Sequence, residues 1–150
     1  MGTYSPSQLA DRVKSLSIEE AHGFWETAGS PHTERLTHEH ACELLAAARG
    51  MSEWYRIMAV LQIGNFYFEN EFVDYAIDML TFPPSGYPAH DELWAHLAKK
   101  DDPWAVSLWA SNLLVSRKTI SPEQYRRISE LPDNTFHKQE LLDALKPRVA

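Results

Sequence analysis

The sequence predicts an all-α protein, and three observations lead to this prediction. Residues able to cap a helix recur about every 32 residues, which is the length that a two-helix repeat unit needs. Proline follows a capping side chain at Ser5, Asp102 and Ser121, and proline is favoured at the first position of a helix. Apolar residues then follow at helical spacing, whereas strand-like alternation is nearly absent. The evenly spaced caps are Ser5, Thr37, Asn70, Asp102 and Asn134.

In the first part of the chain, a side chain that can accept a hydrogen bond precedes each expected helix. Its partners would be the backbone N–H groups in the first turn of the helix, which have no acceptor within the helix. Ser5 precedes Pro6, and Ser17 with Glu20 has the spacing of a capping box. Thr37 and Ser52 stand before two further amphipathic runs. We therefore expect helices at 6–16, 18–28, 38–49 and 53–63.

The second part shows the same signals. Asn70, Asp102, Ser121 and Asn134 each precede an apolar run of helical spacing. Three prolines between positions 82 and 88 exclude a helix there and indicate a surface loop. We expect helices at 71–81, 91–99, 103–116, 122–131 and 135–146.

A helical hairpin is predicted in the middle of the chain. Gly64 and Asn65 are typical of a helix end, so the hairpin would join a first arm at 53–63 to a second at 71–80. The segments 55–64 and 102–114 resemble HEAT-type helical repeats. The resemblance covers about half of the chain, and it implies a short stack of antiparallel helix pairs of the kind used mostly for protein binding. An irregular helical bundle is the alternative architecture.

Length and charge limit the functional classes. The chain of 150 residues, 44% hydrophobic, is long enough to bury a core as one domain over 1–150. Its net charge of −7 argues against nucleic-acid binding and favours a basic protein partner. Residues 1–75 hold 11 of the 21 acidic side chains but only 5 of the 14 Lys and Arg. The sequence shows no signal peptide, no membrane span and only one cysteine, so we expect a cytoplasmic protein that does not enter membranes.

The densest set of potential metal ligands lies between His38 and Cys42. His38 and Cys42 share one helical face, and His40 and Glu43 share another, so no face offers three ligands. Cys42 is expected on the apolar side of its helix, where burial makes a thiol inert. We predict no catalytic residue, no bound metal and no cofactor. Haem ligation by His90 and His96 is a less favoured possibility.

An acidic surface around a tyrosine is the main candidate for a binding site. If Phe72, Val73, Ala76, Ile77 and Leu80 form the buried stripe of their helix, Glu71, Asp74, Tyr75 and Asp78 share the opposite face. Unpaired carboxylates on one face repel each other, and a basic partner would relieve that repulsion. An exposed tyrosine among them has the composition of an interaction hot spot. The predicted partner-binding residues are Tyr67, Glu69, Glu71, Asp74, Tyr75 and Asp78.

The sequence thus predicts a non-enzymatic protein that binds another protein. The most concrete form is an inhibitor or immunity protein that neutralises a basic toxin or effector by covering it. A scaffold or adaptor subunit of a complex is the first alternative. A metal-dependent hydrolase that uses the region from His38 to Cys42 is the second.

Overall fold

The predicted all-α class is confirmed by the computed structural model, which describes residues 4–28, 36–81, 104–133, 135 and 137–150. The described residues form helices and an isolated bridge between Ile120 and Val149, without a named strand. The helices are α1 (Pro6–Lys14), α2 (Ile18–Ala21), α3 (Trp25–Ala28), α4 (His38–Ala48), α5 (Trp54–Tyr67), α6 (Val73–Thr81), α8 (Trp104–Val115), α9 (Pro122–Ser129) and α10 (Lys138–Leu145), followed by the 3-10 turn η1 (Lys146–Arg148). None of these described helices is long and apolar enough to cross a membrane.

Four helices begin where the capping residues predict. Ser5, Ser17, Thr37 and Ser121 each accept a hydrogen bond from the backbone N–H three residues ahead. In each case the side chain of that third residue also accepts from the N–H of the capping residue, which completes a capping box. These starts are determined locally, because donor and acceptor lie within one turn.

Other predicted boundaries are wrong. α6 begins at Val73, whose N–H donates to the backbone oxygen of Asn70 at 3.3 Å, so Asn70 lies in the preceding turn. α5 follows Glu53, which makes no side-chain cap, and α10 follows His137 in the left-handed conformation. Asp102, Asn134 and the expected helix at 91–99 lie outside the described residues, so the evenly spaced caps do not establish a repeat.

Two glycines explain further differences. The expected helix at 18–28 is divided into α2 and α3 because Gly23 adopts a φ of +78°, a conformation that ends a right-handed helix. Gly64 was expected to end a helix, but α5 continues through it to Tyr67. Gly64 is buried against the ring of Phe72, so its role is to allow a close approach rather than to end the helix.

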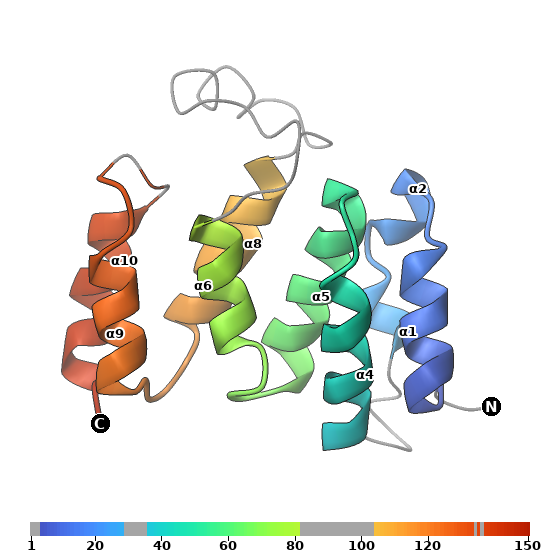
Figure 1. Ribbon diagram of the computed structural model, residues 1–150, viewed down its shortest axis with the longest axis horizontal. Helices are drawn as coiled ribbons and strands as arrows, with labels where there is room; N and C mark the ends of the chain where they lie inside the picture. Colours follow the sequence, from blue (N-terminus) through green and yellow to red (C-terminus); the bar gives the residue numbers. More distant parts are fainter. Residues whose placement is uncertain (1–3, 29–35, 82–103, 134, 136) are drawn as a thin grey trace.

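α5 is the central helix of the array (Figure 1). Its residues from Ile57 to Gly64 are all buried, as expected for a helix covered on every side. α5 and α6 both pack closely on α8 rather than chiefly on one another, which corrects the predicted hairpin of 53–63 and 71–80. α1 packs on α4 at one end of the array, and α9 contacts α6 and α10 at the other. The buried side chains join one core that extends from Leu9 to Leu145.

The first two helices are joined by an ion pair whose strength should depend on pH. Arg12 Nη2 lies 2.7 Å from Glu20 Oε2, and the other Glu20 oxygen accepts from the backbone N–H of Ser17 at 2.9 Å. The Ser17 N–H and the Arg12 guanidinium lower the pKa of Glu20 to about 2. In the unfolded chain the same carboxyl has a pKa of about 4.3, so the folded state holds this proton less tightly.

We expect Glu20→Gln to reduce the acid sensitivity of the fold. Because the folded pKa is the lower one, the contribution of Glu20 is present above about pH 4.5 and is lost as the pH falls toward about 2. Urea unfolding midpoints measured between pH 7 and pH 2 should therefore fall less steeply for Glu20→Gln than for the wild type. Glu19→Gln, which removes a neighbouring exposed carboxylate, serves as the control. Parallel curves for the wild type and Glu20→Gln would contradict the prediction.

Candidate functional site

Four of the six predicted binding residues line one surface pocket. Glu71, Asp74, Tyr75 and Asp78 contribute to a pocket of about 310 Å³ between the end of α4 and one side of α6. We call it the α4–α6 pocket. Its complete lining is Leu45, Ala48, Arg49, Met51, Glu71, Asp74, Tyr75, Asp78 and Met79. The pocket therefore combines apolar walls with three carboxylates.

Tyr75 is not the exposed residue that the sequence predicts. Tyr75 is only 7% exposed and belongs to the hydrophobic core. The buried face of α6 is wider than a single stripe, because α6 contacts α8 and α9 and also faces the end of α4 across the pocket. A substitution at Tyr75 therefore affects packing, which corrects the expectation of an exposed anchor.

The Tyr75 hydroxyl is buried without a hydrogen-bond partner among the described residues. Burial and, to a smaller extent, the charge of Asp78 raise the pKa of this phenol well above its ordinary value. The hydroxyl is therefore neutral at physiological pH. A buried, unpaired hydroxyl is costly because it has lost its water without gaining another partner.

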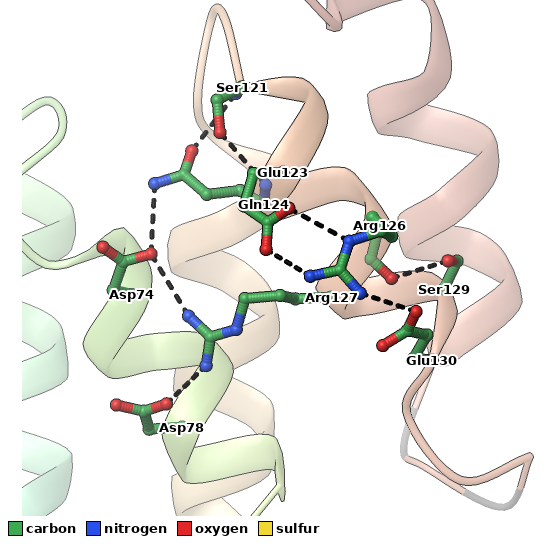
Figure 2. A network of polar contacts seen from close by, with 9 residues as sticks. All are labelled: Asp74, Asp78, Ser121, Glu123, Gln124, Arg126, Arg127, Ser129 and Glu130. Carbon is green, nitrogen blue, oxygen red and sulfur yellow. Dashed lines mark hydrogen bonds and ion pairs between the residues drawn. The ribbon is translucent and has the colours of Figure 1, made fainter.

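Asp74 and Asp78 are also not unpaired, contrary to the prediction. Arg127 of α9 places Nη1 3.3 Å from Asp74 Oδ1 and Nη2 2.5 Å from Asp78 Oδ1. Gln124 adds a donor to Asp74 Oδ1 at 3.3 Å (Figure 2). The two carboxylates thus share a cation of their own chain, which relieves the repulsion that was predicted to require a partner. Each pair is partly exposed, so it contributes at most about 1 kcal/mol to stability.

Glu71 lines the pocket and also contacts the first residue of α4. Its Oε2 is 3.4 Å from Nδ1 of His38, which is exposed at the first position of α4. Burial acts to raise the pKa of Glu71, but the N–H of Glu71 itself, His38 and the N–H of Asn70 together lower it below its ordinary value. Glu71 is therefore a carboxylate at neutral pH, and it links α4 to the turn before α6.

Tyr67 and Glu69 belong to a different pocket, so the six predicted residues do not form one site. That pocket lies between the end of α5 and the end of α8 and is also lined by Arg117. The Tyr67 hydroxyl donates to the backbone oxygen of Trp25 at 2.7 Å, and the backbone oxygen of Glu69 accepts from Arg117 at 2.7 Å. Both residues therefore support the structure around α5.

The region from His38 to Cys42 divides between two environments. His40 is buried, with Nδ1 3.0 Å from the N–H of Thr37 and Nε2 2.6 Å from the backbone oxygen of Tyr4. Cys42 is exposed, which corrects its predicted position on the apolar side of α4. The helix turns its buried face toward α1 through Ala41, Leu44 and Ala48 instead. In the described part of the chain, no three His, Cys, Asp or Glu side chains are grouped to hold a metal ion.

The local sequence does not indicate that Arg49, Met51 and Met79 line the α4–α6 pocket or that Arg127 binds two of its carboxylates. Arg127 of α9 binds Asp74 and Asp78, which lie 53 and 49 residues before it in sequence, so no local spacing indicates the contact. Arg49, Met51 and Met79 line the pocket only because the end of α4 lies beside α6. Comparison with known proteins finds no matching family, no similar curated protein and no similar solved structure.

We expect Tyr75→Phe to stabilise the protein by about 1 kcal/mol, because it removes a buried hydroxyl that has no partner. Chemical unfolding at neutral pH measures this effect. Tyr67→Phe is the matched control, since it removes a hydroxyl that donates at 2.7 Å and should destabilise by a similar amount. A loss of stability in Tyr75→Phe would show that its hydroxyl is satisfied in solution.

Proposed function

We propose that this protein acts by binding a basic protein partner at the α4–α6 pocket. The observation that supports the proposal most directly is the lining of the pocket, in which Leu45, Met51 and Met79 stand beside three carboxylates. Such a mixture suits a side chain with an apolar stem and a cationic end. The net charge of −7 would favour the approach of a basic partner over a long range.

The protein would bind its partner without catalysing a reaction on it. Neutralisation of a basic toxin or effector by an inhibitor or immunity protein is the specific form of this function that we propose. The scaffold or adaptor role uses the same contact without inhibition. The two differ in their consequence, since only the inhibitor abolishes an activity of the bound partner.

A capture experiment with paired charge variants tests the proposal. Tagged wild-type protein and the variant Glu71→Gln/Asp78→Asn are incubated with extract of the native host at low and moderate salt. The variant Glu19→Gln/Glu140→Gln is the control, because it removes the same charge at exposed positions on α2 and α10. We expect a basic protein to be retained by the wild type and the control and to be lost with the pocket variant, more strongly at moderate salt.

Purified components then distinguish the two forms of the function. Loss of the activity of the partner on stoichiometric addition of this protein would support the inhibitor, and an unchanged activity in a stable complex would support the adaptor. Capture of the same proteins by all three forms would overturn the proposed site.

A further inference from the structure

The capping box at the start of α4 differs in its chemistry from the other three. The third helical residue is glutamine or glutamate in the boxes that begin α1, α2 and α9. In α4 it is His40, whose Nδ1 lies 3.0 Å from the backbone nitrogen of Thr37. Of these side chains only imidazole changes its charge close to neutral pH, so this box alone can respond to pH in that range.

The two ring nitrogens of His40 have fixed and opposite roles. Nδ1 accepts, because the backbone N–H of Thr37 is directed at it and can only donate. Nε2 donates, because the atom 2.6 Å away is the backbone oxygen of Tyr4, which can only accept. The imidazole is therefore neutral in this arrangement, with its proton on Nε2. It joins two segments of the chain that lie 36 residues apart.

A second proton on His40 would break one of these contacts. It must bind at Nδ1, which then becomes a donor and faces the Thr37 N–H, so that this N–H loses its acceptor. The Thr37 hydroxyl lies 2.8 Å from Nδ1 and can accept from the new N–H, but it does not restore an acceptor to the backbone. Because His40 is only 7% exposed, water reaches the unpaired groups only if the side chain moves outward.

The charged groups of the surrounding helices do not compensate a proton on His40. α4 packs on α1 and α5, and within the described residues none of their side chains forms an ion pair with His40. These groups are paired with other residues or are exposed. They are Asp11, Arg12 and Lys14 on α1, His38, Glu39 and Glu43 on α4, and Arg56 on α5.

We propose that His40 is a pH-sensitive switch that holds the chain at Tyr4 against the start of α4 while its imidazole is neutral. Protonation at Nδ1 removes the contact with Thr37, turns the side chain outward and thereby releases Tyr4. The unfolded chain has no such contact to lose, so this contribution to stability is present above about pH 6.5, where an ordinary imidazole is neutral, and is lost as the pH falls. The switch does not depend on the proposed partner.

NMR on wild-type protein with labelled imidazole nitrogens tests the geometry directly. At about pH 8 we expect the nitrogen shifts of His40 to be those of the tautomer with its proton on Nε2. On acidification to about pH 5.5, the Thr37 amide signal should shift together with the titration of His40. The Ser121 amide is the internal control, because it donates to Gln124, which does not titrate, and its signal should stay in place.

Urea unfolding of two variants tests the consequence for stability. His40→Gln keeps an acceptor for the Thr37 N–H, as Gln8 does for Ser5, but it cannot be protonated in this range. His38→Gln removes an exposed histidine of the same helix and is the control. Below about pH 6.5 the folding equilibrium constant of the wild type and of His38→Gln should fall more steeply than that of His40→Gln, by up to about tenfold for each pH unit.

Two outcomes would overturn the inference. One is a tautomer with its proton on Nδ1 at about pH 8, and the other is a parallel loss of stability in the wild type and His40→Gln on acidification. If His40→Gln does not fold, the tautomer and the Thr37 amide shift of the wild type decide, and an amide signal that ignores the titration of His40 counts against the switch.

Discussion

Replacing Arg117 with methionine is expected to destabilise the protein by about 3 kcal/mol. Arg117 is 7% exposed, and its guanidinium donates to the backbone oxygens of Asn65, Phe68 and Glu69 and to the side chain of Asn65. Asn65 belongs to the last turn of α5, whose carbonyl oxygens have no helical N–H to bind, and Phe68 and Glu69 directly follow the helix. Methionine would fill a similar volume but leave these acceptors without their donor.

Lys118→Met is the matched control for this prediction. Lys118 is the next residue and is exposed, so its replacement removes the same charge without taking a donor from buried backbone oxygens. It should change the stability of the protein by no more than about 0.5 kcal/mol. Arg117→Lys should recover only part of the loss, because one ammonium group does not replace the two guanidinium nitrogens that together bind three backbone oxygens. Urea unfolding measures all three variants. If Arg117→Met and Lys118→Met lowered the free energy of unfolding equally, the backbone oxygens would be hydrogen-bonded to water in the Arg117→Met variant.

Gly64→Ala is expected to destabilise the protein by about 2 kcal/mol even though alanine is the better helix former. A Cβ atom at position 64 would lie 2.6 Å from Cγ and 2.7 Å from Cβ of Phe72, distances at which α5 or the turn that carries Phe72 must shift. The gain in helix propensity is only about 1 kcal/mol, and overpacking a core commonly costs more than that. The clash involves the stem of a fully buried ring rather than the end of a flexible side chain.

Gly50→Ala is the control for the second prediction, because a Cβ atom there would meet only the backbone oxygen of Ala47 at 3.8 Å. Thermal or urea unfolding should leave this variant near the wild type. Combining Gly64→Ala with Phe72→Ala should cost less than the sum of the single changes, since removing the ring together with Cγ takes away the contact at 2.6 Å. A strictly additive loss in the double variant would contradict the proposed clash.

Helical periodicity predicts part of the arrangement of Glu71, Asp74, Tyr75 and Asp78, but not all of it. The spacing of Glu71, Asp74 and Asp78 correctly places them together at one side of α6. The same reasoning places Tyr75 with them as an exposed residue, although the structure buries it. Periodicity indicates which residues share a face, but it does not show how many neighbours cover the helix.

By itself the sequence determined the helical class and the starts of four helices. Ser5, Ser17, Thr37 and Ser121 cap their helices through hydrogen bonds that extend over three residues, so their geometry follows from local chain stereochemistry. Tertiary structure decided that α5 continues through Gly64, that Tyr75 is buried, and that Asp74 and Asp78 share Arg127. These features depend on which helices meet, and contacts between residues about 50 positions apart leave no pattern in the local sequence.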